Sequence, residues 1–442
     1  MGFLERLNGV ADAAVADWSV EARSQRSPVL AILASLALGL ILAIAFVLGP
    51  AAGRSEPVVT GSVMLAFGIG WGVMAILTTR FSAQPQPWMA VPAVALGFVG
   101  LGLILFRPGP AAMDVLSWIW PVALLILGIW MLVQVRRHLT GGGRWLVIPT
   151  IAVLMLIAVG GAFETVSGAS GRANATGPGQ LIDVGGHQLY IECSGSGNPA
   201  VVLQSGLGES SSSWSRIAPE IAASTNVCAY DRPGHGRSDE AEPQDGIALA
   251  SDLHTLLDRA GVAGPYVLVG HSSGGDYMRV FAGRYPDELA GMVLIDAQPA
   301  DAFSALPDYP TTYQWVLRPL SSLTAPLARI GLYRLFDGPE NVDPAYGRAY
   351  RDAVTQLPQV LDQARAVTSL GSLPLIVVSA GTGGQAGWDA AQERLAELST
   401  RSAHRVIPTA THDSLISGDD ASASSQAILD VLAAIRSGTA PH

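Results

Sequence analysis

Lysine is absent from the 442-residue chain, and all 26 of its basic residues are arginines. Acidic residues number 36, so the formal net charge is −10. The excess of acid is confined to the second part, because residues 1–163 carry a net +3 and residues 164–442 a net −13. Binding of nucleic acids depends on basic patches that neutralise phosphates, so we expect no nucleic-acid partner. The arginine-only, Ala- and Gly-rich composition is typical of a GC-rich bacterial genome.

Cysteine is nearly absent as well. The chain has only Cys193 and Cys228, and it has no Cys/His cluster with the spacing of a metal site. We therefore expect neither a metal ion nor a cofactor.

Charged residues are missing from five long apolar segments within residues 1–163. Each segment has at least 19 residues, and a helix of that length spans about 29 Å, close to the roughly 30 Å of a bilayer core. We therefore predict an α-helical membrane domain with five spans. Because transporters usually keep ionisable groups inside the membrane, we expect this domain to anchor the protein rather than to transport a solute. The predicted spans are 29–48, 58–79, 88–106, 115–135 and 145–163.

The distribution of arginines predicts the orientation of the spans. If the N-terminus is cytoplasmic, the outer loops hold only Arg54 and Arg107, and the inner side holds seven arginines. Arginine and lysine favour the cytoplasmic side. Five spans then place the residues after 163 outside the cytoplasm, so we expect a multi-pass cell-membrane protein. The inner arginines are Arg6, Arg23, Arg26, Arg80, Arg136, Arg137 and Arg144.

A Gly/Ser/Ala-rich segment at 164–179 is the predicted linker to a second domain at 180–442. In that domain short β-rich runs alternate with helical stretches, which predicts a mostly parallel sheet covered on both faces. The glycines at 185–186 predict an antiparallel hairpin at its start. The predicted strands are 180–184, 187–193, 200–204, 226–230, 265–269, 291–296, 373–379 and 403–408. The predicted helices are 213–223, 246–260, 274–284, 387–398 and 422–436.

A glycine-packed corner follows the predicted strand 265–269. Residues 270–274 read Gly-His-Ser-Ser-Gly and match G-x-S-x-G between a strand and a helix, where the motif marks a nucleophile on a sharp turn. Ser272 has a glycine two positions before it and another two positions after it, whereas the bulky His271 lies two positions before Ser273. Ser272 is therefore the predicted nucleophile. The backbone N–H of Ser273, at the helix N-terminus, would stabilise an oxyanion.

A serine nucleophile needs a base, and the expected order along the chain is serine, acid, histidine. Three histidines follow the region between the sixth and seventh predicted strands. His404 lies inside the last predicted strand and His442 ends the chain, whereas His412 lies on a loop just beyond that strand. His412 is therefore the predicted base.

Two aspartates are candidates for the acid. The usual position follows the strand 373–379, but no acidic residue lies at a short offset there, and the first is Asp389. Asp296 ends the preceding strand, where a carboxylate can orient an imidazole and stabilise its charged form. We favour Asp296 and keep Asp389 as the alternative.

Residues 180–436 resemble the α/β-hydrolase family. Besides the serine motif, the resemblance is carried by AYDRPGHGRSD at 229–239 and by GRYPDELAGMVLID at 283–296, the latter resembling lipase-like members that carry their acid there. The resemblance implies a mostly parallel eight-stranded sheet with a helical cap, here at about 298–370. It also implies that the N–H of Leu207 is a second oxyanion donor.

Two details follow from this resemblance. Many members have His-Gly after the third strand, and this chain has Ser205 in place of the histidine. The second and fourth strands are neighbours in the fold, so Cys193 and Cys228 are candidates for a disulfide, which an extracytoplasmic domain would permit. A disulfide and two buried thiols are both compatible with that placement.

Together these features predict a membrane-anchored serine hydrolase that cleaves a carboxylic ester through an acyl-enzyme, as esterases and lipases do. The expected partners are a small-molecule ester or lipid substrate and the lipid bilayer. A peptidase or amidase on the same triad is one alternative, and a non-catalytic binding or sensing module on the hydrolase fold is another. The sequence specifies neither the substrate nor the oligomeric state.

Overall fold

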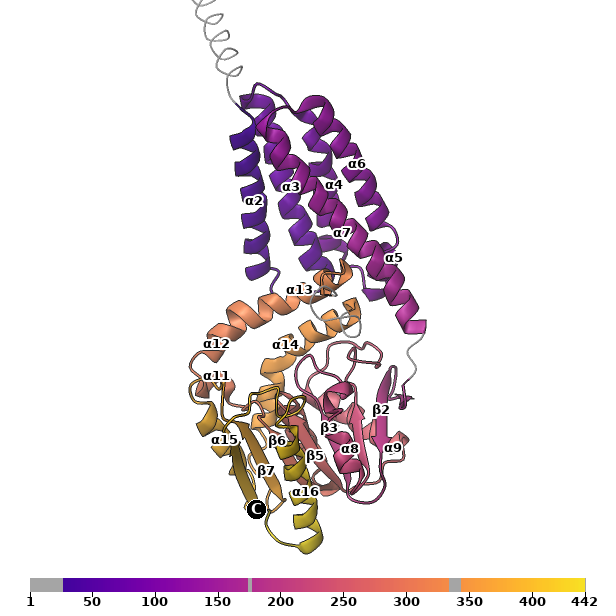
Figure 1. Ribbon diagram of the computed structural model, residues 1–442, viewed down its shortest axis with the longest axis vertical. Helices are drawn as coiled ribbons and strands as arrows, with labels where there is room; N and C mark the ends of the chain where they lie inside the picture. Colours follow the sequence, from indigo (N-terminus) through magenta and orange to yellow (C-terminus); the bar gives the residue numbers. More distant parts are fainter. Residues whose placement is uncertain (1–26, 174–176, 334–342, 442) are drawn as a thin grey trace, which may run out of the picture. The chain divides into compact units, whose positions relative to one another are not determined.

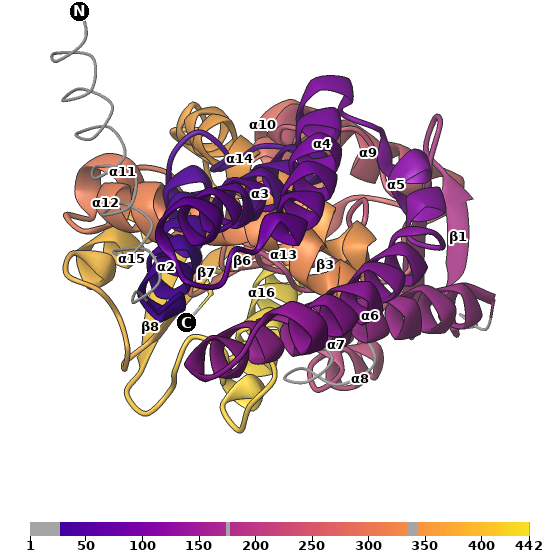
Figure 2. The same ribbon diagram turned by 90° about the horizontal axis from the view of Figure 1, so that it is seen from above.

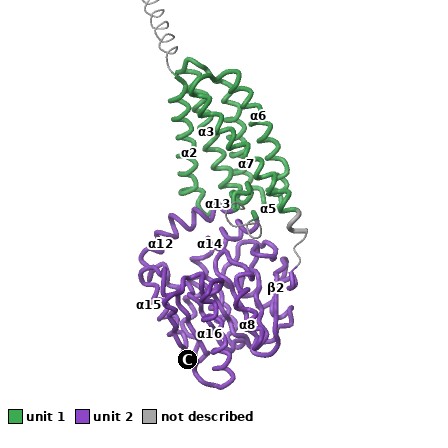
Figure 3. The backbone as a smooth tube through the Cα atoms, viewed as in Figure 1, with its two compact units in different colours: residues 1–172, 325–344 green, residues 173–324, 345–442 purple. Residues whose placement is uncertain are grey.

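The computed structural model divides the chain into two compact units, which are coloured separately in Figure 3 and drawn as ribbons in Figure 1. The described residues are 27–173, 177–333 and 343–441. Unit 1 comprises residues 1–172 and 325–344, and unit 2 comprises residues 173–324 and 345–442. The first unit therefore includes a short piece of chain from late in the sequence.

Five helices in the described part of unit 1 are long and apolar enough to cross a membrane. Two of them, α3 and α4, pack closely where each has a glycine. A Cβ atom added at Gly61 would lie only 2.6 Å from the carbonyl oxygen of Gly100, so the two backbones leave no room for a side chain. Close backbone approach through small residues is common between membrane helices. The five are α2 (Val29–Leu48), α3 (Glu56–Phe81), η1 (Pro87–Met89) with α4 (Ala90–Phe106), α6 (Trp120–His138) and α7 (Gly142–Ala173). The short helix α5 (Pro110–Leu116) lies between α4 and α6 in the chain.

The fourth predicted span, 115–135, is wrong at its start. The short helix α5 ends at Leu116, and α6 begins only at Trp120, with Pro121 in its first turn. Proline lacks an N–H, and the first turn of a helix is the position where this loss costs least, so Pro121 favours a helix start here.

The predicted linker at 164–179 is also wrong in its first part, because α7 continues through Ala173. Glu164 is buried and the hydroxyl of Thr165 donates to the carbonyl oxygen of Ser117 at 3.3 Å, so this turn of helix is held by tertiary contacts. Linker residues 174–176 lie outside the described residues.

The side of the membrane on which each loop lies stays a prediction. Three of the arginines on which it depends, Arg6, Arg23 and Arg26, lie outside the described residues.

A buried arginine lies at the helix ends of unit 1. Arg329, the last residue of α13 (Arg318–Arg329), is 7 % exposed and pairs with Glu56, which is 1 % exposed at the start of α3. Its remaining N–H groups donate to the hydroxyl of Ser117 and, at 3.3 Å, to the carboxylate of Asp114. A buried charge is tolerated only when it is paired and hydrogen-bonded. The end of α13 is therefore fixed to residues more than 200 positions away in the sequence.

Unit 2 is built on an eight-stranded sheet with the order β1-β2-β4-β3-β5-β6-β7-β8. β2 pairs antiparallel with β1 and β4, and the other pairs are parallel. The predicted mostly parallel sheet of eight strands is thus confirmed. The strands are β1 (Gln180–Asp183), β2 (Gln188–Ser194), β3 (Ala200–Gln204), β4 (Val227–Tyr230), β5 (Tyr266–His271), β6 (Leu289–Ile295), β7 (Leu375–Ala380) and β8 (Ser402–Ile407).

Helices cover both faces of this sheet (Figure 2). The central strands are continuous apolar runs because successive side chains point to opposite faces and both faces are buried. In β3, for example, Val202 packs into the core on one face, and Val201 and Leu203 pack into the core on the other. The first face carries α9 (Gly246–Arg259), α10 (Gly274–Arg284) and α15 (Trp388–Ala396), and the second carries α8 (Ala218–Ala222) and α16 (Ala421–Ser437).

The helix predicted at 213–223 is wrong in its extent. It consists of the 3₁₀ turn η2 (Ser211–Trp214) and the short α8, in whose first turn Pro219 lies. A proline cannot continue the hydrogen bonding of the preceding turn, so the helix starts anew there.

The two cysteines lie directly opposite each other on β2 and β4. Cys193 is paired in register with Cys228, and the structure joins them by a disulfide with a Cα–Cα distance of 4.1 Å. Of the two states that the sequence left open, the structure therefore has the bonded one.

Between β6 and β7 the described chain is an insertion of helices, in line with the predicted helical cap at 298–370. Because residues 325–344 cluster with unit 1, this one insertion contributes to both units. Its elements are α11 (Ala302–Ala305), α12 (Tyr309–Thr312), the π-helical turn η4 (Tyr313–Leu317), α13 and α14 (Pro344–Arg365).

We predict that Arg329→Met lowers the stability of the protein in detergent micelles by about 3–5 kcal/mol, because it leaves Glu56 buried without its guanidinium partner. Thermal unfolding measures the loss. The double variant Glu56→Gln/Arg329→Met, which removes both charges, recovers most of it. Arg318→Met, on the first turn of the same helix, is the matched control and changes stability little. Equal melting temperatures for Arg329→Met and the control would show that the buried pair does not hold this helix end.

Candidate active site

Ser272 lies at the corner between β5 and α10. Its φ is +53°, a left-handed conformation that is uncommon for any residue except glycine. Glycines make room for the sharp turn. A side chain at Gly270 would lie 2.6 Å from the backbone of Gly275, and one at Gly274 would collide with the carbonyl oxygen of Gln204. The geometry is that of the predicted strand-to-helix elbow, and backbone strain of this kind is concentrated at functional sites.

Asp296 and His412 are joined by a hydrogen bond, in which Nδ1–H of the imidazole donates to Oδ2 of the carboxylate at 2.6 Å. Asp296 directly follows β6, is 3 % exposed and has a φ of +39°. Its Oδ1 accepts from the indole N–H of Trp388 at 2.9 Å and from the backbone N–H of Ala380 at 3.2 Å. Burial raises the pKa of Asp296, but the hydrogen bonds from His412 and Trp388 lower that pKa more, so the carboxylate stays ionised.

The same pair changes the basicity of the imidazole. Burial lowers the pKa of His412, and the hydrogen bond and charge of Asp296 outweigh burial, so the pKa lies above the ordinary value for histidine. A carboxylate on Nδ1 also fixes the tautomer that leaves Nε2 available as a base. His412 and Ser272 line one cavity of about 420 Å³. No hydrogen bond joins these two described side chains, and such bonds are often long in proteins without substrate.

The other candidates from the sequence lie elsewhere. Asp389 is exposed in the first turn of α15 and forms no ion pair with His412. His404 lies in β8, where its Nε2 is 2.7 Å from the hydroxyl of Ser379. His442 lies outside the described residues.

The two predicted oxyanion donors flank the nucleophile. Ser273 follows Ser272 in the chain, and Leu207 belongs to the loop after β3. This loop lies close to the nucleophile, because a Cβ atom added at Gly206 would be 2.9 Å from Cβ of Ser272. The backbone N–H groups of Leu207 and Ser273 donate to no acceptor among the described residues. Both donors are therefore available to a ligand beside the serine.

Two charged side chains hold the loop after β3. The guanidinium of Arg232, 4 % exposed, donates to the carbonyl oxygens of Ser205 and Gly206, each at 2.7 Å. The carboxylate of Glu209 accepts from the N–H of Gly206 at 2.6 Å. Because C=O and N–H point in opposite directions across a planar trans peptide, the bond to the Gly206 carbonyl also directs the N–H of Leu207.

His271 ties this loop to the loop that carries the base. It is fully buried, with Nδ1 3.1 Å from the carboxylate of Glu209 and Nε2 3.2 Å from the carbonyl oxygen of His412. Burial raises the pKa of Glu209, but the bond from His271 and its charge lower that pKa more, so Glu209 accepts as a carboxylate.

The sequence analysis missed Arg232, Glu209 and Trp388. Arg232 lies in the DRPGHG stretch and Glu209 in the GLGESSSS stretch, so each is adjacent to a recognised motif. Trp388 has no such signal, since it lies 92 residues from the aspartate to which it donates.

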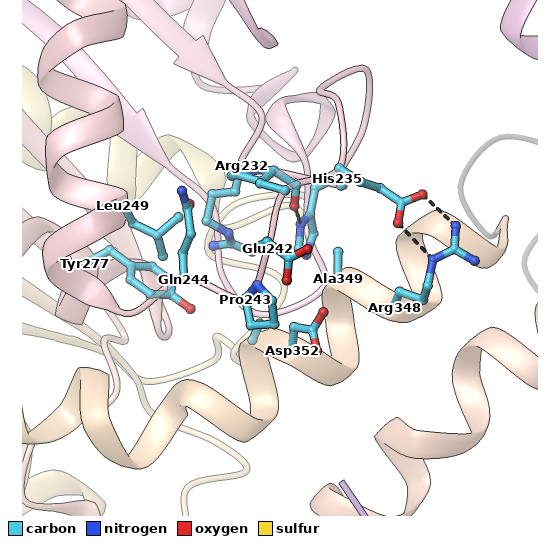
Figure 4. Close-up of a pocket in the computed structure, with 15 residues that line it drawn as sticks. Arg232, His235, Glu242, Pro243, Gln244, Leu249, Tyr277, Arg348, Ala349 and Asp352 are labelled. Carbon is cyan, nitrogen blue, oxygen red and sulfur yellow. Dashed lines mark hydrogen bonds and ion pairs between the residues drawn. The ribbon is translucent and has the colours of Figure 1, made fainter. Parts of the chain in front are cut away.

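A second, smaller cavity of about 50 Å³ lies between residues 232–244 and α14 (Figure 4). The ion pair of Glu240 and Arg348, 2.6 Å long, borders it. Burial, together with the charge of Arg232, lowers the pKa of His235 in its wall to about 3, so that imidazole is neutral. Neither Ser272 nor His412 lines this cavity, which therefore holds none of the predicted catalytic residues.

Comparisons with known proteins agree with this architecture. Residues 199–327 match the family model described as the alpha/beta hydrolase fold. The lipase LipV of Mycobacterium tuberculosis is 39 % identical over 135 residues, which are 27 % of this chain and 50 % of LipV. A protein of Schizosaccharomyces pombe is 30 % identical over 223 residues, which are 46 % of this chain and 41 % of that protein. The chain thus spans half or less of the length of these curated relatives.

Two solved structures are similar to more than half of the chain. One is a thermophilic esterase from Thermogutta terrifontis, which is 22 % identical with a TM-score of 0.45, over 58 % of this chain and 99 % of the esterase. The other is the enol-lactonase from Burkholderia xenovorans LB400, also 22 % identical with a TM-score of 0.45, over 57 % of this chain and 100 % of the lactonase.

We predict that Asp296→Asn lowers the pKa of His412, because asparagine accepts the Nδ1–H bond without the negative charge that stabilises imidazolium. The pKa is measured by NMR titration of protein labelled selectively at histidine nitrogens. Asp389→Asn is the matched control and leaves the titration of His412 in place. A fall in the pKa with Asp389→Asn, and none with Asp296→Asn, would show that the pairing is wrong.

Proposed function

The chain carries an α/β-hydrolase domain, and we propose that it is a serine hydrolase that cleaves a carboxylic ester through an acyl-enzyme. The proposal rests on one observation above the others: the 2.6 Å bond between Asp296 and His412, in the cavity that Ser272 lines from a strained elbow. Serine, histidine and aspartate in these roles are the machinery of acyl transfer. A relative named as a lipase supports the same reaction class.

In the proposed acylation, Asp296 holds the imidazole while Nε2 of His412 removes the hydroxyl proton of Ser272. The serine oxygen forms a bond to the ester carbonyl carbon, and the carbonyl oxygen becomes an oxyanion that accepts from the N–H groups of Leu207 and Ser273. Loss of one such donor typically costs about 2.7–4 kcal/mol of barrier. His412 then gives its proton to the alcohol oxygen as the carbon–oxygen bond breaks, and the alcohol leaves.

In the proposed deacylation, His412 removes a proton from water, which attacks the acyl carbon and releases the carboxylic acid and free Ser272. Both steps begin with neutral His412. Because its pKa is raised, the neutral fraction and hence the rate increase as the pH rises through that value.

We also propose that unit 1 anchors the enzyme in a cell membrane, with the N-terminus in the cytoplasm and the hydrolase domain outside it. The five apolar helices and the arginine distribution support the proposal. The disulfide between Cys193 and Cys228 supports it independently, since disulfides persist in oxidising compartments.

We predict that a fluorophosphonate probe labels the protein at Ser272, because the probe reacts with an activated serine. Ser272→Ala abolishes labelling. Ser273→Ala is the matched control and retains it, since only the backbone N–H of Ser273 is used and its buried hydroxyl has no partner among the described residues. Labelling is measured on intact protein by mass spectrometry. Folded protein that does not react would favour a binding or sensing module on the hydrolase fold.

We predict that Arg232→Lys lowers kcat by about 10- to 100-fold with little change in KM, because lysine keeps the charge but cannot hold two carbonyls in one plane. The substitution would misplace the backbone N–H of Leu207, which donates to the oxyanion in the transition state. Arg237→Lys is the matched control, since Arg237 lies over the ring of Tyr190, 4.9 Å away, and its side chain forms no hydrogen bond with this loop among the described residues. A change in KM alone, or equal effects of the two variants, would contradict a positioning role for Arg232.

A further inference from the structure

The wall of the cavity at Ser272 is more apolar than polar, and a few hydrogen-bonding side chains are set into it. Among the described residues, no leucine, isoleucine, valine, methionine or phenylalanine lines its 420 Å³, and Ala380 is its one aliphatic side chain. Carbon atoms of a substrate can pack against the rings of Trp388 and Tyr309, and burial of such atoms is favourable. The few polar side chains in the wall are then the groups that can select a substrate by hydrogen bonding.

Two side chains in this wall present a hydrogen-bond acceptor and a donor side by side. Gln298 is only 9 % exposed, and its backbone N–H donates to the carbonyl oxygen of Ser272 at 3.0 Å. Its side-chain Nε2–H donates to the hydroxyl oxygen of Tyr309 at 2.5 Å, and its Oε1 accepts from none of the described residues. Because the oxygen of Tyr309 accepts that bond, the tyrosine's own hydrogen is left to donate.

A hydroxyl group complements this arrangement, because it accepts from Tyr309 and donates to Oε1 of Gln298 at the same time. Burial raises the pKa of Tyr309, so the donor keeps its hydrogen at neutral pH. A carboxylate or phosphate would have no hydrogen for Gln298, and the exposed Asp413 on the rim of the cavity would repel it. A neutral hydroxyl group fits this arrangement, and an anion does not.

The neighbours of His412 indicate which half of the ester binds here. The imidazole that protonates the leaving oxygen lies in the wall of this cavity together with Thr411 and Asp413. The alcohol half of the ester thus leaves from the side on which Gln298 and Tyr309 lie.

We propose that this cavity binds the alcohol part of the ester and that Gln298 and Tyr309 recognise a hydroxyl group next to the ester oxygen. The substrate class is then an ester of a diol, glycerol or sugar-like alcohol. This inference rests on the proposed ester hydrolysis. The reaction consumes one water and one ester, and it yields the carboxylic acid and the polyol, whose freed oxygen takes its proton from His412.

The test uses two acetates that differ by one hydroxyl, cyclohexyl acetate and the monoacetate of trans-cyclohexane-1,2-diol. The ratio of their kcat/KM values is divided by the ratio of their hydroxide-catalysed rates, which removes the difference in intrinsic reactivity. We expect the corrected ratio to favour the diol ester by at least about 10-fold, since two hydrogen bonds are gained and neither protein group is left unpaired.

Variants then assign the preference to the two side chains. Gln298→Leu and Tyr309→Phe each bring the corrected ratio to about one. Tyr313→Phe is the matched control and keeps it, because the Tyr313 hydroxyl donates to the carbonyl oxygen of Val354 and does not line the cavity.

A third ester, cyclohexyl glycolate, carries the hydroxyl on the acyl half. A preference for it, with none for the diol ester, would overturn the assignment to the alcohol. Fluorophosphonate labelling separates the inference from the proposed function. If the labelled protein shows a corrected ratio of one or less, or turns over neither acetate, the inference is wrong while the serine hydrolase assignment stands. Protein that neither labels nor hydrolyses any of the esters contradicts both.

Discussion

The hydrogen bond between Asp296 and His412 is the interaction on which the proposed chemistry depends. The carboxylate is buried, and it stays ionised because three donors surround it: the imidazole, the indole of Trp388 and the backbone of Ala380. The parallel sheet supplies the geometry, since β5, β6 and β7 end at one edge and β8 leads into the loop of His412. An ionised partner on Nδ1 is what allows an imidazole to act as a base on a serine.

Three side chains near this pair, Arg232, Glu209 and His271, are each held by hydrogen bonds. Arg232 and Glu209 are held against the backbone of the loop after β3, and His271 connects that loop to the carbonyl of His412. Buried polar groups cost free energy unless they are satisfied, and a satisfied network specifies one conformation. The same logic applies in unit 1, where Arg329 and Glu56 pair in a buried setting. In both units, charge pairing fixes the backbone at positions where the sheet or the helices alone would not.

Local patterns in the sequence were sufficient for part of this description. Runs of β-forming residues identified all eight strands, and the glycines around G-x-S-x-G selected Ser272. Chain order and strand ends selected His412 and favoured Asp296 over Asp389, and the structure brings Ser272, Asp296 and His412 to one cavity. The roles of Trp388 and Arg329 could not be predicted, because their partners lie 92 and 273 residues away and no local pattern encodes such contacts. The late start of α6 and the extension of α7 depended on a proline and on tertiary contacts, which hydropathy does not record.

The central claim is that Asp296 is the acid that supports His412, and the most direct test is the turnover number of two variants on one ester. We expect Asp296→Asn to lower kcat by about 10⁴-fold, as loss of the charge behind a catalytic histidine does. Asp389→Asn, which alters an exposed residue of α15, should leave kcat close to that of the unmodified protein. A far larger loss with Asp389→Asn than with Asp296→Asn would contradict the account.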